Sequence, residues 1–317
     1  MTSYDGLLRK LEEKGLTKTD LTEKLGISSR TVAKISRGEK IADHVLKKIA
    51  DFLGCTTEEL CRSVSDNTLL QTLRDEKSIR MSGGLYHELQ VRMTYNSNHI
   101  EGSKLSEDQT RLIFETNTVD VGEGIPVDDI IETVNHFRAI DYVIDVAEEP
   151  LTESIVKELH RILKQSTKDS TLSWFAVGDY KKRPNVVGGR ETVKPKDVPF
   201  RMKALLDDYA ALPTVTVNDI IRFHYRFLAL RPFAQGTGRM SRLLLLLQLI
   251  ARGVLHEPIL TMSIWLEGNI AEYRTCLDEA ILRGNEQPLL MFFHDGFSDC
   301  AGAACNSVVS HSDSYRM

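Results

Sequence analysis

The chain has 317 residues, of which 42% are hydrophobic and 27% charged, and its formal net charge is −5 at pH 7. This composition is typical of a globular protein and leaves room for two domains. No apolar run reaches the roughly 18 residues that a membrane span needs, and we expect no secretion signal because the N-terminus lacks an apolar core. The five cysteines are odd in number and lack metal-site spacing, so we expect free thiols in a reducing cytoplasm.

Residues 1–65 predict a separate small helical domain. A turn at Gly26 joins two short helices, and Ser28 or Ser29 caps the second of them. The apolar positions of the two helices are Leu21, Leu25, Ile27, Val32 and Ile35.

The same segment continues with an Arg37-Gly38 turn and a helix over 42–53, and it resembles the XRE-type helix-turn-helix of phage repressors. The resemblance implies a homodimer whose recognition helix, 29–36, lies in the major groove of DNA. The residues expected to face the groove are Ser29, Arg30, Thr31 and Lys34. Because residues 1–65 hold 12 basic and 10 acidic side chains, the segment is only mildly basic. The alternative is a helical protein-docking module without DNA contact.

Helical patterns follow this segment. We expect a short helical linker over 66–78 and helices over 84–99, 128–147 and 152–163. His160 lies on a partly apolar face of the last of these helices. We therefore interpret His160 as a hydrogen-bonded core histidine rather than a ligand.

Valines and glycines within 176–192 predict a short β-hairpin, and a solvated charged loop is the alternative. The residues that favour the hairpin are Val177, Gly178, Tyr180, Val186, Val187 and the Gly188-Gly189 pair. The segment is basic through Lys181, Lys182, Arg183 and Arg190. A helix over 197–211 is expected next.

Residues 217–252 predict a helix, a glycine loop and a second helix. Thr216 is the predicted N-cap of the first helix, with Asp219 placed to bond back, and Pro232 ends it. Its apolar face consists of Ile220, Phe223, Phe227 and Leu230. The second helix is apolar all round over 243–250, so we expect it to be central and buried.

The glycine loop predicts an anion site. Gly236, Thr237 and Gly238 let the backbone turn, and Arg239 and Arg242 share one face of the first helical turn. Backbone N–H groups at a helix start, together with two guanidinium groups, suit the binding of phosphates.

The run 231–242, RPFAQGTGRMSR, resembles the signature of the Fic (fido) family, His-Pro-Phe-x-Asp/Glu-Gly-Asn-Gly-Arg-x-x-Arg. Members of that family typically transfer AMP from ATP to a hydroxyl side chain of a target protein. The matching positions are Pro232, Phe233, Gly236, Gly238, Arg239 and Arg242. Three positions depart: the general-base histidine of the family is Arg231 here, its metal-binding carboxylate is Gln235, and its asparagine is Thr237.

These departures change the expected chemistry. A guanidinium has no acceptor and keeps its proton, so Arg231 is unsuited to act as a general base. Gln235 offers one neutral oxygen, so we expect only weak Mg²⁺ binding. The resemblance still implies ATP as the ligand. We therefore predict a site better at holding phosphate than at activating a nucleophile.

The end of the helical segment 84–102 resembles a second part of the family. Its residues Ser97-Asn98-His99-Ile100-Glu101-Gly102 match the inhibitory pattern Ser/Thr-x-x-x-Glu-Gly/Asn. This resemblance implies that Glu101 pairs with Arg242 and blocks productive ATP binding. The alternative is an ordinary helix end with Gly102 as its C-cap.

Two further stretches resemble family elements. The hairpin over 176–192 resembles the flap, which implies that a target peptide adds as a strand beside Val186, Val187 and Gly188. Asn269 and Tyr273 follow a helix start predicted near Glu267 and have the type and spacing of residues that line the adenine pocket in the family. The alternative is that Asn269 and Tyr273 are ordinary helix-surface residues. A last helix is expected over 287–305, before a polar tail.

We predict a mainly α-helical protein with a helix-turn-helix domain over 1–65 and a Fic-like domain over 79–317. Three functions compete. The first, which Arg231 favours, is a DNA-binding regulator whose Fic-like domain binds a nucleotide without efficient AMP transfer. The second is an active protein adenylyltransferase that is autoinhibited by Glu101 and acts on an unknown target protein. The third is a Fic-like domain that uses another phosphate-containing substrate or carries out a different transfer reaction.

Overall fold

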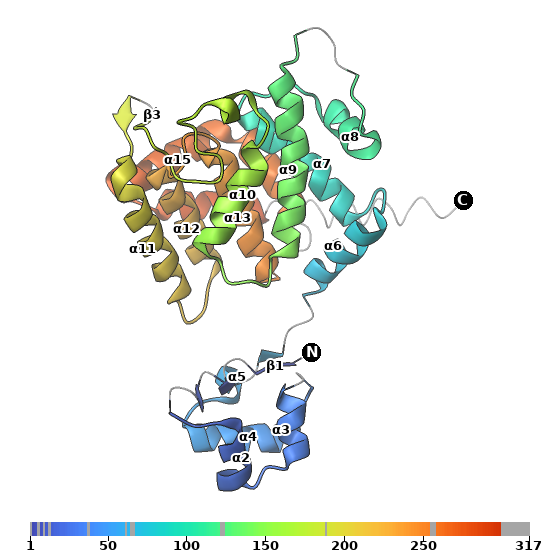
Figure 1. Ribbon diagram of the computed structural model, residues 1–317, viewed down its shortest axis with the longest axis vertical. Helices are drawn as coiled ribbons and strands as arrows, with labels where there is room; N and C mark the ends of the chain where they lie inside the picture. The colour runs from blue at the N-terminus through green and yellow to red at the C-terminus, as the bar shows by residue number, and fades with distance from the viewer. Residues whose placement is uncertain are drawn as a thin grey trace, which may run out of the picture. The chain divides into compact units, whose positions relative to one another are not determined.

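A computed structural model divides the protein into two compact units, Met1–Gln71 and Thr72–Met317 (Figure 1). The residues described are 2–4, 7–8, 10–11, 14–36, 39–60, 62–63, 67–120, 124–187, 189–253 and 258–298. Nearly all regular structure within them is helical, which confirms the predicted fold class. Among these residues, no helix is long and apolar enough to cross a membrane.

The first unit packs its helices around one apolar core. The elements are α2 (Lys18–Leu25), α3 (Ser29–Ser36), α4 (Asp43–Leu53), α5 (Thr57–Leu60) and the antiparallel two-residue strands β1 (Thr2–Ser3) and β2 (Arg62–Ser63). The predicted apolar residues all join this core, with Leu21, Ile27 and Ile35 buried and Leu25 and Val32 packed against them. The sequence pattern did not predict the strand pair.

Local signals fix the turn between α2 and α3. Gly26 ends α2 with a left-handed φ of 65°, a conformation that glycine adopts without a Cβ penalty. The Thr31 N–H then donates to Ser28 Oγ at 3.2 Å. Of the two predicted caps, Ser28 is therefore the one that caps α3.

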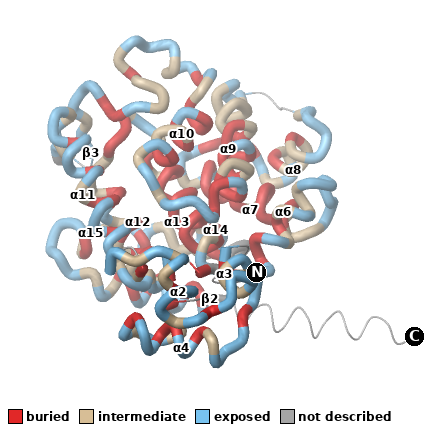
Figure 2. The backbone as a smooth tube through the Cα atoms, turned by 60° about the horizontal axis from the view of Figure 1, so that its bottom comes forward, coloured by how far each residue is buried: buried red, intermediate tan, exposed pale blue. Residues whose placement is uncertain are grey.

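A buried helix, α13 (Thr237–Ala251), lies at the centre of the second unit. The helices packed against it are α7 (Leu85–Ile100), α9 (Val127–Asp145), α10 (Glu153–Lys164) and α12 (Val217–Leu230). Figure 2 shows buried residues along both α13 and α9. The residues of 243–250 are all buried, as their apolar pattern predicts.

Further elements surround this core. They are α6 (Thr68–Ile79), α8 (Glu107–Thr116), the 3-10 turns η1 (Lys168–Thr171) and η2 (Pro195–Asp197), α11 (Val198–Ala210), α14 (Pro258–Gly268), α15 (Ile270–Arg283) and a helix over 287–298. The stretch predicted as a helical linker forms α6. Its Arg74 and Lys77 form ion pairs with Glu148 and Asp145 at 2.7 and 2.6 Å, beside the end of α9.

The predicted hairpin is present but shorter than expected. Strands β3 (Val186–Val187) and β4 (Arg190–Glu191) pair antiparallel. Val177 and Gly178 lie in a turn, and Tyr180 also precedes the strands, so the strand pattern predicted for these three residues is wrong. One reason is that the Lys181 N–H donates to Pro232 O at 2.9 Å instead of pairing across the hairpin. Gly188 lies outside the described residues.

The prediction of a helix start near Glu267 is also wrong. Helix α14 begins at Pro258, a residue that fits the first turn of a helix because its missing N–H needs no partner there. Glu267 lies near the end of α14, and Asn269 separates it from α15. Residues 299–305 of the predicted last helix and the polar tail lie outside the described residues.

The cap of α12 provides a test of this fold. Thr216 and Asp219 form the predicted capping box, in which the Asp219 N–H donates to Thr216 Oγ1. We expect Thr216→Ala to lower the free energy of unfolding of the second unit by about 1 kcal/mol because one helix-start N–H loses its partner. The measurement is urea unfolding followed by tryptophan fluorescence, since both tryptophans, Trp174 and Trp265, lie in this unit. The exposed Thr214→Ala serves as control, and equal losses in both variants would contradict the capping role.

Candidate functional site

The loop between α12 and α13 has an unusual backbone at both ends. Arg231 ends α12 in the left-handed region with φ 46° and ψ 61°, which is uncommon for a residue with a side chain. Gly236 then precedes α13 with a φ of 78°. No side chain caps α13 within the described residues, so its first backbone N–H groups form the positive end of a buried helix.

A neutral histidine, His160, packs against this loop. The His160 ring stacks on Phe233 with centroids 3.9 Å apart, and its Nδ1 accepts from the Gly178 N–H at 3.0 Å. Its Nε2–H therefore donates to Gln235 O, at 3.3 Å. Burial lowers the pKa of His160 to about 3, so the ring is uncharged at neutral pH. The prediction of a hydrogen-bonded core histidine is confirmed.

The hairpin is fixed to the same loop. Besides the Lys181 N–H bond to Pro232 O, the Asn185 side chain donates to Phe233 O at 3.2 Å. Lys181 Nζ donates to Asn185 Oδ1 at 2.8 Å and to Thr192 Oγ1 at 2.6 Å, which ties the two ends of the hairpin together. Burial, together with the charge of Arg231, lowers the pKa of Lys181 to about 8.

A cavity of about 370 Å³ lies where the loop, the hairpin and two carboxylates meet. Its lining residues are Glu101, Glu132, Asn185, Val186, Val187, Arg231, Ala234, Gln235, Gly236, Thr237, Gly238 and Arg239. The structure thus brings together the predicted signature loop, two of the predicted flap residues and the predicted inhibitory glutamate. The volume lies near the lower end of the range for small-molecule sites.

Glu101 pairs with Arg242 as predicted. Glu101 Oε1 lies 2.8 Å from Arg242 Nη2, and Arg242 also donates to the Ser97 hydroxyl and carbonyl oxygens at 2.9 Å each. A Cβ atom at Gly238 would lie 2.2 Å from Glu101 Oε1, so the approach of this carboxylate requires glycine. Glu101 also marks the end of α7, as the alternative interpretation expects, but the C-cap is Glu101 itself and Gly102 follows it with a φ of 96°.

Three guanidinium groups act on this one carboxylate. Burial by itself raises the pKa of Glu101, but the charges of Arg242, Arg239 and Arg231 outweigh burial and hold that pKa below its ordinary value. The Glu101 carboxylate is therefore ionised at neutral pH, in contact with Arg242 and in the same cavity as Arg231 and Arg239.

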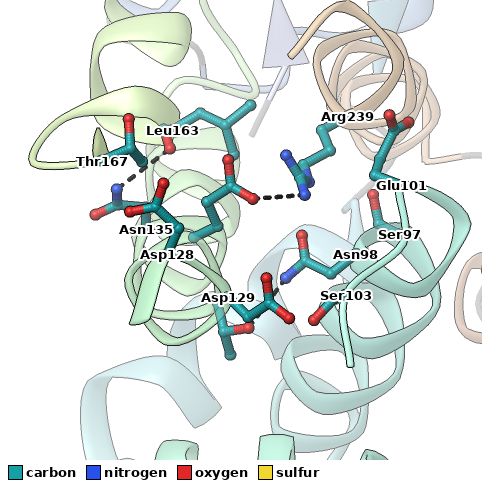
Figure 3. A network of polar contacts seen from close by, with 12 residues as sticks. Ser97, Asn98, Glu101, Ser103, Asp128, Asp129, Asn135, Leu163, Thr167 and Arg239 are labelled. Carbon is teal, nitrogen blue, oxygen red and sulfur yellow. Dashed lines mark hydrogen bonds and ion pairs between the residues drawn. The ribbon is translucent and has the colours of Figure 1, made fainter. Parts of the chain in front are cut away.

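Glu132 is a site residue that the sequence did not predict. Its Oε2 lies 2.7 Å from Arg239 Nη2, and its Oε1 accepts from Lys164 Nζ. The three side chains are 14%, 8% and 3% exposed, so this is a nearly buried group of two cations and one anion. In Figure 3 Arg239 lies between Glu101 and the polar residues of α9. The signal available in the sequence was the run of polar residues in the middle of α9.

Both units of the chain match models of known protein families. Residues 7–66 match the model for the Cro/C1-type HTH DNA-binding domain, and residues 150–249 match the model for the Fic/DOC family. The chain contains a Fic domain. A Protein adenylyltransferase Fic from Aedes aegypti is 27% identical over 238 residues, which are 73% of this chain and 44% of that protein. The chain therefore spans less than half the length of this curated relative.

Solved structures agree on the fold of the Fic domain. A Fic domain containing signaling protein from Bacteroides thetaiotaomicron is 26% identical with a TM-score of 0.57, over 74% of this chain and 90% of that protein. A Fic family protein from Desulfovibrio desulfuricans is 20% identical with a TM-score of 0.60, over 78% of this chain and 76% of that one, and supports the fold alone.

The donor set of the Fic domain does not fit a metal ion. Gln235 is neutral, and the two carboxylates that line the cavity, Glu101 and Glu132, already contact cations. Within the ranges that the structure describes, no group of three His, Cys, Asp or Glu side chains is close enough to hold a metal.

Asn269 and Tyr273 do not line the cavity. Tyr273 is 4% exposed, and its hydroxyl donates to His224 Nε2 at 2.6 Å, while His224 Nδ1–H donates to Ser241 O at 3.1 Å. Tyr273 is thus a core residue and not a surface residue, and His224 links it to Ser241 near the start of α13. The Asn269 side chain donates to Trp265 O at 3.0 Å. A contact of either residue with a nucleotide stays a prediction.

The residues predicted to face DNA all lie on α3. Ser29 and Arg30 are exposed, and Thr31 and Lys34 are half-buried. Their contact with DNA also stays a prediction.

The pKa of Glu101 leads to a pH-dependent test. Because the folded-state pKa is below the ordinary 4.5, the carboxylate stabilises the fold above about pH 4.5, and this contribution is lost as the pH falls through the folded-state value. We expect Glu101→Gln to unfold at lower urea concentration than the parent at pH 7, with the difference shrinking below pH 4.5. Tryptophan fluorescence gives the unfolding curves. Glu148→Gln, in an exposed ion pair, is the control, and a Glu101→Gln difference that is constant with pH would exclude this role.

Proposed function

We propose that the protein is a DNA-binding regulator whose Fic domain holds a nucleotide phosphate group but transfers AMP weakly or not at all. The observation that carries this proposal is the position of Arg231. Its side chain lines the same cavity as Glu101 and the start of α13, at the sequence position where the family has its histidine.

Arg231 supports binding rather than catalysis. Burial lowers its pKa, but a guanidinium in a protein stays protonated at any working pH and offers no lone pair to a target hydroxyl. The other ionisable groups that line the cavity do not replace it. Glu101 and Glu132 are engaged by Arg242, Arg239 and Lys164, and Arg239 is itself a cation. A hydroxyl brought here would therefore keep its proton.

The hairpin supports a protein target as a further partner. Val186 and Val187 are 61% and 40% exposed, and they form β3 at the rim of the cavity. An exposed strand can pair with an extended peptide through backbone hydrogen bonds. In this proposal a target protein docks on the hairpin without being modified efficiently.

Restoring the family residues tests the catalytic part of the proposal. We expect the parent to incorporate no labelled AMP from ATP and the double variant Arg231→His with Gln235→Glu to gain labelling by roughly 100-fold over background, because a general base typically contributes that much. The assay follows labelled AMP on the protein itself and on proteins of a cell lysate. The control is Arg226→His, because Arg226 is an exposed residue of α12, the helix that ends just before Arg231. A parent that labels as strongly as the double variant would refute the proposal.

The second candidate is an active adenylyltransferase autoinhibited by Glu101. The Glu101–Arg242 ion pair and the similarity to the Protein adenylyltransferase Fic of Aedes aegypti favour it. The same assay separates the two candidates. Labelling by Glu101→Gly with Arg231 in place supports the second candidate, and labelling that needs Arg231→His supports the first.

The regulatory part of the proposal depends on α3. We infer that it enters the major groove of DNA, that a homodimer reads two half-sites, and that the protein acts in the cytoplasm, where that DNA is. Arg30 is the exposed cation near the N-terminal end of this helix.

We expect Arg30→Ala to weaken specific DNA binding about tenfold, because a guanidinium that contacts a base edge contributes about 1–3 kcal/mol. The measurement is fluorescence anisotropy with a DNA site selected from a random pool, at several salt concentrations. Arg201→Ala, an exposed cation on α11, removes the same charge elsewhere and should bind like the parent. Equal binding by all three proteins at every salt concentration would remove the recognition role of α3.

A further inference from the structure

The charges around the cavity do not balance. Glu101 is the partner of Arg242, and Glu132 carries one negative charge but contacts two cations, Lys164 and Arg239. The Arg231 guanidinium forms no hydrogen bond or ion pair within the part of the chain that the structure describes. The described residues at the cavity therefore leave an excess of positive charge.

A buried and a half-buried guanidinium group point to a missing partner. Arg239 is 7% exposed, and its Nε has no hydrogen-bond partner among the described residues. Arg231 is half-buried and lines the same cavity. Withdrawing a guanidinium from water without a partner costs free energy, which an anion between the two groups would offset. The N-terminal end of α13 adds its positive dipole at the same cavity.

We propose that this cavity binds a condensed phosphate, such as pyrophosphate or the polyphosphate chain of a nucleotide, in its metal-free form, with Arg231 and Arg239 as its charged donors. The inference rests on the proposed function and specifies its ligand. The excess positive charge of the cavity neutralises the negative charge of the phosphate chain, so a metal ion is not needed for this purpose. Since Gln235 is neutral and both carboxylates are engaged, a magnesium ion in the cavity would face cations instead of ligands.

Calorimetric titration with inorganic pyrophosphate tests this inference. The parent and Glu101→Gly are both titrated, because Glu101 pairs with Arg242 and lines the same cavity as Arg231 and Arg239. We expect binding in EDTA and at least tenfold weaker binding in excess Mg²⁺, since the metal complex of the ligand carries less negative charge. Arg231→Ala should weaken binding at least tenfold, and Arg231→Lys should lie between it and the parent. Arg226→Ala, on the same helix and paired with Asp208 outside the cavity, is the matched control.

Three results would overturn the inference: binding only in the presence of Mg²⁺, binding equal in Arg231→Ala and Arg226→Ala, or no pyrophosphate binding by either background protein in EDTA. Parallel titrations with ATP separate this inference from the proposed function. ATP that binds only with Mg²⁺ overturns the metal-free site but leaves nucleotide binding standing. Pyrophosphate that binds in EDTA, with no ATP binding under either condition, supports the site and contradicts the nucleotide part of the proposed function.

Discussion

The pairing of two buried arginines with carboxylates from neighbouring helices is the interaction on which the Fic domain depends. Helix α13 carries Arg239 and Arg242 near its N-terminal end and continues with a buried, mainly apolar run. A buried guanidinium that loses its carboxylate costs about 3–5 kcal/mol, so the first turn of α13 requires counter-charges. The end of α7 supplies Glu101, and the middle of α9 supplies Glu132. The same two ion pairs therefore hold the three helices together and determine the charge of the cavity.

The shape of the loop before α13 follows from contacts beneath it. Phe233 is fully buried against the neutral ring of His160, and this fixes where the chain turns toward Gly236. Gly238 leaves room for the Glu101 carboxylate at a distance where any Cβ atom would collide with it. The hairpin is held by backbone oxygens of the same loop. Changes at Arg231, Gln235 and Thr237 can therefore alter the chemistry of the cavity while the scaffold that shapes it stays intact.

The sequence predicted those features whose causes lie within a few residues of one another. The capping box of Thr216 and Asp219, the cap at Ser28 and the buried run of α13 are of this kind, and each is present. The Glu101–Arg242 pair was predicted only through a family resemblance, because nothing local connects α7 to α13. Glu132 was missed because a glutamate in mid-helix resembles a surface residue until Arg239, far along the chain, is packed against it.

The presence of Glu101 beside Arg231 has a physical explanation that does not need inhibition. Arg242 is 3% exposed, and Arg231 and Arg239 lie close enough to act on the same carboxylate. Without Glu101 these guanidinium groups would repel one another in a poorly solvated space. An anionic ligand and Glu101 satisfy the same need, so they compete for the same charges. Glu101 thus serves as a counter-charge for three arginines, and Arg231 adds to the positive charge that it offsets.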